Sequence, residues 1–137
     1  MNKKKTKNGK EELPELPHEL GNYLLLIHEL ITEKGYVRGV ELAERLDMSR
    51  PTITRAIQRL AALGYANYER YRGLTLSKSG IEAAQHANAR YQTVFNFLEA
   101  TGTNFSNIKL DARRLAAIAS DDTLAAFKSA TNKLRKQ

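Results

Sequence analysis

Apolar residues recur at helical spacing along the first third of the chain. From residue 20 to residue 31 they fall three or four positions apart, which is typical of one buried face of a long helix. These residues are Leu20, Tyr23, Leu24, Ile27, Leu30 and Ile31. Gly35 is expected to end the helix, because glycine readily takes the left-handed conformation that closes a helix. A second, shorter helix is predicted from Val40, Leu42, Ala43 and Leu46.

A third helix is predicted to begin directly after the turn at residues 47–49. Ser49 is a good N-cap, since its hydroxyl accepts a hydrogen bond from a free backbone N–H of the first turn. Pro51 lies in that first turn, where its missing N–H costs little. The buried face is expected to comprise Ile53, Ile57, Leu60 and Leu63. Gly64 is expected to end this helix.

The spacing of the apolar residues then changes from the helical pattern to one in which apolar and polar residues alternate. Residues 65–69 and 74–76 are typical of two short strands, joined by a turn at residues 71–73. A long helix follows, capped by Ser77 or Ser79 and broken at Gly102. Its seam is spaced 3-4-3-4-3 and comprises Ile81, Ala84, Asn88, Tyr91, Phe95 and Leu98. Two further helices are predicted, at residues 108–119 and after Ser120, the latter with acids at its start and bases at its end as the helix dipole favours.

Composition and charge exclude several classes of protein. The 137 residues contain no cysteine, which excludes a disulfide scaffold and a thiolate metal site. No apolar run approaches the roughly 18 residues that a membrane span needs. The net charge is +7, and five lysines in the first ten residues supply +5 of it, leaving +2. We expect residues 1–17 to form a flexible basic arm and a proline joint; the arm either contacts nucleic acid or only aids solubility.

The order of elements predicts a winged helix-turn-helix, in which the third helix enters the major groove and its N-terminal residues face base edges. Arginine can bind guanine through two hydrogen bonds, and glutamine can bind adenine in the same way. The predicted DNA contacts are Ser49, Arg50, Pro51, Thr52, Thr54, Arg55, Gln58 and, at the wing tip, Arg72. Residues 35–76 hold seven arginines, no lysine and four acids. The alternative is a solvated helix with ordinary surface arginines.

Five segments carry a family resemblance: EKGY, ELAERLDMSRPTITRAIQRL, YERYRGLTLSKSG, RYQTVFNFL and LDARRLAAIASDDTLAAF. They resemble the DtxR/MntR repressors, the manganese-responsive branch in particular, over about 110 residues from Leu20 onward. The resemblance implies a mostly α fold, with a winged helix-turn-helix DNA-binding domain at 18–78 and an all-helical dimerisation domain at 79–137. It also implies a homodimer on a palindromic operator, in which bound manganese or iron locks the DNA-binding pose. The long seam favours such a dimer, unless part of it belongs to the core of one chain.

The positions that the resemblance assigns to metal ligands hold none of the expected side chains. The family uses an Asp and a Glu on the first helix, a His on the long helix, and two Glu and a His on the short helix. The corresponding residues here are Asn22, Leu25, Tyr91, Arg113, Ala116 and Ala117. Manganese needs oxygen and nitrogen donors, so we expect the site to be lost and no cofactor to be required. We further expect Leu25, Tyr91 and the two alanines to pack together in its place, with Arg113 near Asn22 or the phenol oxygen.

Two other chemistries were considered. A relocated manganese or iron site could use Glu82 and His86, an i, i+4 pair on one helix face, although such pairs also occur by chance. An enzyme is not expected, since the chain has no glycine-rich phosphate loop, HExxH motif, nucleophile elbow or cysteine nucleophile.

The sequence thus predicts a cytoplasmic, nucleoid-associated and metal-independent transcriptional regulator, more specifically a repressor, whose partners are double-stranded DNA and a second copy of itself. Three alternatives remain. The first is a repressor that still responds to manganese or iron through relocated ligands. The second is a non-regulatory DNA-binding component with little sequence discrimination, and the third is a paralogue that forms mixed dimers with a metal sensor.

Overall fold

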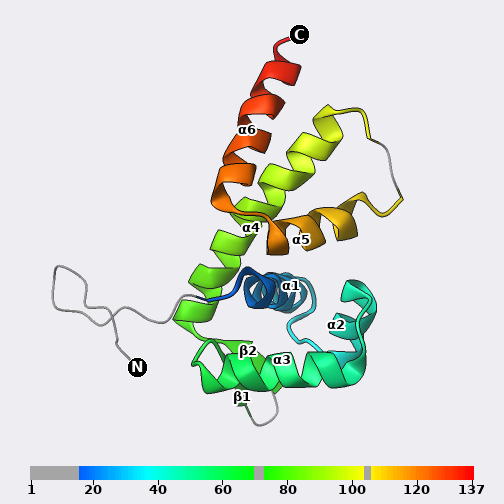
Figure 1. Cartoon of the computed structure of the whole chain (residues 1–137). Helices are drawn as coiled ribbons and strands as arrows, with labels where there is room; N and C mark the ends of the chain where they lie inside the picture. The colour runs from blue at the N-terminus through cyan, green and yellow to red at the C-terminus, as the bar shows by residue number, and fades with distance from the viewer. Residues whose placement is uncertain (1–15, 70–72, 104–105) are drawn as a thin grey trace, which may run out of the picture.

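The computed structural model describes residues 16–69, 73–103 and 106–137. It is mostly helical, with one antiparallel two-stranded sheet in which Ala66 pairs with Leu76 and Glu69 with Gly73 (Figure 1). In chain order the elements are α1 (His18–Lys34), α2 (Gly39–Leu46), α3 (Arg50–Ala62), β1 (Ala66–Glu69), β2 (Gly73–Leu76), α4 (Lys78–Ala100), α5 (Ile108–Ile118) and α6 (Asp121–Arg135). This order confirms the predicted winged helix-turn-helix followed by helices. None of the described helices has the length and apolar character that a membrane crossing requires.

The helix α1 lies at the centre of the molecule. In Figure 1 it is seen nearly end-on, with α2, α3 and the sheet on one side and α4 and α5 on the other. Every residue from Leu20 to Ile27 is buried. The sequence predicted only one buried face, and the difference follows from this central position, because a helix covered on opposite sides has little surface left for water.

Several local signals act as the sequence predicted. Gly35 closes α1 in the left-handed conformation, with a φ of 82°. The Ser49 hydroxyl caps α3 by accepting a hydrogen bond from the Thr52 N–H. Of the two candidate caps for α4, the structure selects Ser77, whose hydroxyl accepts from the Gly80 N–H. Ser120 caps α6 in the same way.

Two apolar clusters divide the interior. The larger joins α1, α2, α3 and the wing, and includes Leu24, Leu30, Leu42, Ile53 and Leu60. The smaller joins α1 to α4, α5 and α6, and we call it the junction cluster. Its buried members are Leu25, Ala87, Tyr91, Val94, Ala112, Ala116 and Leu124. Because α1 contributes to both clusters, it connects the DNA-binding half to the helical half.

Leu63 was expected on the buried face of α3 and is instead 39% exposed, because it lies at the end of that helix beyond the core. Val40, near the start of α2, is 40% exposed. The seam of α4 is occupied within one chain: Ala84 and Tyr91 are buried, and Phe95 and Leu98 pack against the junction cluster. Asn88 on that seam is exposed. The seam therefore gives no argument for a dimer.

Gly80 is fixed by a close approach between the start of α4 and the start of the wing. A Cβ at this position would lie 2.1 Å from the Tyr65 carbonyl oxygen. We expect Gly80→Ala to lower the free energy of unfolding by roughly 1–3 kcal/mol, since the clash outweighs the helix propensity that alanine gains. Urea denaturation checks this, with Gly39→Ala as the control because nothing lies within 4 Å of a Cβ there. Equal effects of the two substitutions would contradict the clash.

Candidate nucleic-acid interface and the junction behind it

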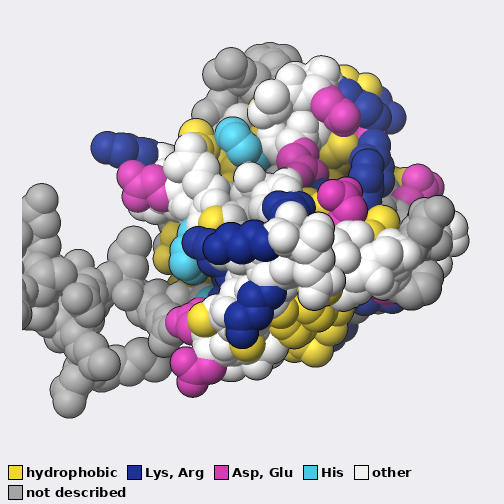
Figure 2. All heavy atoms as spheres, turned by 90° about the horizontal axis from the view of Figure 1, so that it is seen from above, with side chains coloured by type: hydrophobic (Ala, Val, Ile, Leu, Met, Phe, Trp, Pro, Cys, Tyr) yellow, Lys and Arg dark blue, Asp and Glu magenta, His cyan; other side chains and the backbone are white. Residues whose placement is uncertain are grey.

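The exposed face of α3 carries the side chains that the sequence assigned to base contacts. Arg50, Thr54, Arg55 and Gln58 are exposed, and α3 contains no acidic residue. The helix lies at one end of the molecule, away from α6 (Figure 1). The opposite end shows Lys and Arg interspersed with Asp and Glu (Figure 2). The end formed by α3 differs from the opposite end. Its helix offers cationic and amide hydrogen-bond donors and carries no carboxylate of its own.

Two of the predicted contacts are already engaged within the cap of α3. The Ser49 and Thr52 hydroxyl oxygens lie 2.7 Å apart, and Thr52 is half-buried. Pro51 is exposed in the first turn and has no N–H to donate. These three residues shape the start of α3, whereas the side chains of Arg50, Arg55 and Gln58 are exposed on its surface.

The wing is described only up to its tip. Arg72 lies outside the described residues, so its predicted DNA contact is not placed. On β1 the structure shows an exposed aromatic residue that the sequence analysis did not single out. Tyr68 is 68% exposed beside α3. An aromatic ring left in water on a strand is the signal that could have identified it, because its hydroxyl can donate to a phosphate.

Two contacts tie the turn between α2 and α3 to the rest of the molecule. The Tyr23 hydroxyl of α1 lies 3.1 Å from the Met48 sulfur. Arg114 of α5 pairs with Asp47 at 3.4 Å between Nη2 and Oδ2. Asp47 has a φ of 52°, so the turn is held in a left-handed conformation. The turn that positions α3 thus contacts both α1 and α5.

The positions that the family resemblance assigns to metal ligands converge between α1, α4 and α5. Leu25, Tyr91 and Ala116 are 3%, 7% and 3% exposed and belong to the junction cluster. This is the packing predicted from the sequence. Ala117 differs, because it is half-buried and lines a hollow beside α1 and the α2–α3 turn.

The charged side chain of Arg113 connects α5 to α1 and α4. Its Nη2 donates to the Glu29 carboxylate at 2.6 Å, and its guanidinium carbon lies 4.9 Å from the centre of the Tyr91 ring. The Asn22 side-chain amide donates to the Arg113 carbonyl oxygen at 2.5 Å. Three of the six positions are therefore joined by direct contacts, and a protein cation occupies this region.

These side chains do not fit a manganese or iron ion. The side chains of Leu25 and the two alanines have no donor atoms, and Asn22, whose amide N–H donates to the Arg113 carbonyl oxygen, offers only a neutral amide oxygen, a weak ligand. Burial is the main cause that raises the pKa of the Tyr91 hydroxyl; Arg113 lowers it and Glu29 raises it further. The phenol therefore stays neutral and does not offer a phenolate ligand. A guanidinium at this place also repels a divalent cation.

Arg90 is a buried residue whose role the sequence analysis missed. It is 5% exposed, and its guanidinium donates to the carbonyl oxygens of Ala116 and Ala119 and to the Asp121 carboxylate. Arg90 thus supplies hydrogen-bond donors to the backbone carbonyl oxygens at the carboxyl end of α5 and pairs with the first residue of α6. The local sequence pattern does not single out this residue, since a single arginine on a long helix is normally a surface residue.

The candidate relocated site lies elsewhere, at the start of α1 and α4. Glu82 and His86 line one pocket with His18. Within the described ranges, no three or more His, Cys, Asp or Glu side chains are grouped to hold a metal ion.

Comparisons with known proteins agree with this architecture. Residues 15–74 match the family model described as "Iron dependent repressor, N-terminal DNA binding domain". The chain is 36% identical over 114 residues to the transcriptional regulator MntR of Escherichia coli O157:H7, covering 83% of this chain and 74% of that protein. It is 37% identical over 108 residues to MntR of Salmonella typhimurium, covering 79% and 69%.

Two solved structures share the fold. The manganese regulator SloR superposes with a TM-score of 0.69 at 20% identity over 86% of this chain, and T. acidophilum IdeR with 0.67 at 18% identity over 82%. The chain spans just over half the length of each, 55% and 53%. Its family is one of regulators rather than enzymes. With its winged helix-turn-helix and relatives of this identity, the chain belongs to the DtxR/MntR family of DNA-binding transcriptional regulators.

Proposed function

We propose that the protein is a homodimeric, sequence-specific repressor that binds a palindromic operator and holds its DNA-binding pose without manganese or iron. The observation that carries the proposal is the junction between α1, α4 and α5, where Leu25, Tyr91 and Ala116 pack together and Arg113 pairs with Glu29. A regulator of this kind acts on chromosomal DNA and so works in the cytoplasm.

The proposed metal independence rests on the free energy that the packing at this junction contributes. In a metal-responsive relative, an ion linking the first, long and short helices would supply the free energy that orders the pose. Burying one leucine side chain stabilises a structure by about 1.5–3 kcal/mol, which is similar to a typical allosteric coupling of 1–3 kcal/mol. Leu25 alone can therefore replace the contribution of an ion, and the contacts of Arg113 add to it.

The dimer is proposed to use the exposed faces of α5 and α6 rather than the seam of α4. Ile118 at the end of α5 is 80% exposed, and Leu134 on α6 is 36% exposed. Beside Ile118 lies a hollow of about 360 Å³ lined in part by Leu110 and Ala117. An apolar side chain this exposed next to an apolar hollow favours a partner surface. A two-fold dimer presents two copies of α3 about one DNA turn apart, or a multiple of it.

Arg55 is expected to read one base position. A bidentate arginine contact is worth about 1–3 kcal/mol of discrimination, so Arg55→Ala should weaken the preferred site by about tenfold or more and relax the preference at one position. Selection of bound sequences from a random DNA pool measures both effects. Arg135→Ala on α6 is the matched control and should leave the selected profile unchanged. An unaltered profile for Arg55→Ala would contradict the assignment of α3.

The same selection separates the competing functions. Enrichment of one palindromic sequence is expected of a regulator. Weak preference with a steep dependence on salt, driven by the lysines of residues 1–10, is expected of a non-regulatory DNA-binding component. A paralogue that acts in mixed dimers would bind weakly alone and gain affinity only with its partner.

A further inference from the structure

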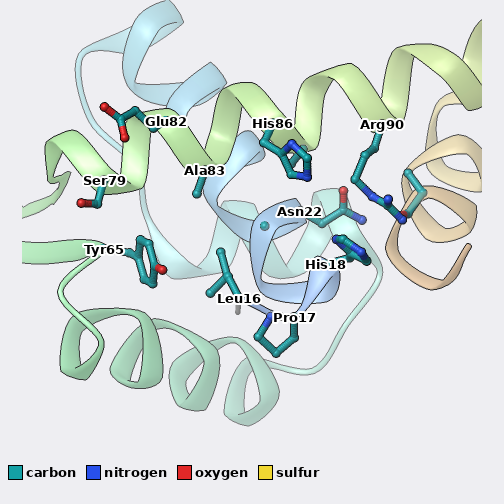
Figure 3. Close-up of a pocket in the computed structure, with 13 residues that line it drawn as sticks. Leu16, Pro17, His18, Asn22, Tyr65, Ser79, Glu82, Ala83, His86 and Arg90 are labelled. Carbon is teal, nitrogen blue, oxygen red and sulfur yellow. The ribbon is translucent and has the colours of Figure 1, made fainter. Parts of the chain in front are cut away.

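A second pocket lies at the start of α1, away from α3, and two of its lining residues, Ala87 and Ala116, belong to the junction cluster. It has a volume of about 350 Å³ and opens between the first turn of α1 and the first half of α4. His18 from α1 and His86 from α4 lie on neighbouring walls of this pocket (Figure 3). The chain contains three histidines, so two of the three meet here.

The two imidazole rings are spaced for a shared ion. Their centres are 6.3 Å apart, with an angle of 34° between the ring planes. A zinc ion lies about 2.0–2.1 Å from each imidazole nitrogen, so two ligating rings have centres roughly 5–6.5 Å apart. The spacing of the two ring centres therefore lies within the range of two rings that share an ion, once one nitrogen of each ring is turned toward it.

A carboxylate is available as a further ligand. Glu82 lines the same pocket one helical turn before His86, and residues four apart on a helix are neighbours on its surface. In Figure 3 its carboxylate is turned away from His86, so it would have to swing inward. Arg90 also lines the pocket, but its guanidinium is held by the Ala116 and Ala119 carbonyls and Asp121.

We propose that this pocket binds a divalent ion of the kind that prefers imidazole, with zinc as the representative, through His18, His86 and water, and with Glu82 as an optional ligand. Imidazole suits zinc, copper and nickel, whereas manganese prefers carboxylate and carbonyl oxygens. The bound ion links the start of α1 to α4. The proposal does not depend on the metal-independent junction, because the two sites share no ligand.

The test is calorimetric titration of the untagged full chain with zinc chloride and, separately, with manganese chloride. One zinc per chain is expected, with manganese at least about tenfold weaker. His18→Ala and His86→Ala should each weaken zinc binding by about tenfold or more, as loss of a ligand or its support does. His28→Ala removes the remaining histidine, which lies on α1 away from this pocket, and should leave zinc affinity within about twofold.

Thermal unfolding gives a second readout that does not depend on the heat of binding. Zinc should raise the unfolding midpoint of the parent chain and of His28→Ala by several degrees, because a ligand bound only by the folded state stabilises it. The midpoint of His86→Ala should not move. His86 is exposed, so this variant is expected to fold, and circular dichroism checks it. Absence of saturable zinc binding, binding that survives both substitutions, or equal loss in His28→Ala would overturn the proposal.

Discussion

Replacing Leu25 with aspartate is expected to lower the free energy of unfolding by roughly 4 kcal/mol or more. The leucine side chain is 3% exposed within the junction cluster. Truncating a buried leucine costs about 2–5 kcal/mol, and moving a carboxylate from water into an apolar cluster adds to that cost. Chemical denaturation measures this loss.

Leu25→Ala tests the same contact in a chain that still folds. It should cost about 2–4 kcal/mol, whereas Leu63→Ala, at a 39% exposed leucine just after α3, should cost less than about 1 kcal/mol. Because Leu25 belongs to the contact between α1, α4 and α5, Leu25→Ala should also weaken operator binding although α3 is unchanged. A variant with unaltered stability and unaltered operator affinity would show that this cluster does not hold the pose.

Replacing Arg90 with methionine is expected to cost about 2–4 kcal/mol of stability. The substitution keeps most of the apolar stem but leaves the Ala116 and Ala119 carbonyl oxygens at the end of α5 without their donor. Hydrogen bonds from a charged donor contribute about 1.5–3 kcal/mol each, and buried acceptors left unpaired are costly.

Asp121→Asn separates the ion pair from the carbonyl contacts. Asp121 is 90% exposed, so its pairing with Arg90 is screened by water, and its loss should change the free energy of unfolding by less than about 1 kcal/mol. Denaturation of both variants gives the comparison. Similar losses for Arg90→Met and Asp121→Asn would place the stabilisation in the ion pair and contradict the role assigned to the carbonyl groups.

The fold was predictable because its local signals are strong and agree with one another. Serine caps, Pro51 and the glycines at positions 35 and 64 mark the ends of helices through backbone chemistry, which acts over a few residues. The change from helical to alternating spacing of apolar residues between α3 and α4 indicated the wing. The helical spacing of apolar residues in α3 also predicted that its arginines are exposed.

Burial across the chain was less predictable. Leu25 lies off the main stripe of α1, and it is buried only because a second cluster covers the other side of that helix. The seam of α4 looked like a dimer contact, since spacing alone cannot tell whether a partner or the same chain covers it. Arg90 and Asp121 are 31 residues apart, and their pairing depends on how α5 and α6 return to α4. Such contacts arise from tertiary packing, not from the local pattern.

The most direct test of the proposed metal independence is the dissociation constant for the selected operator, measured in EDTA and then with excess manganese. An ion-dependent family mechanism would change affinity by about 5- to 150-fold. Running His86→Ala in parallel removes the proposed zinc pocket from the comparison. If the junction cluster and Arg113 hold the pose, the constants with and without the ion will agree within about twofold. Loss of binding in EDTA that manganese restores would contradict it.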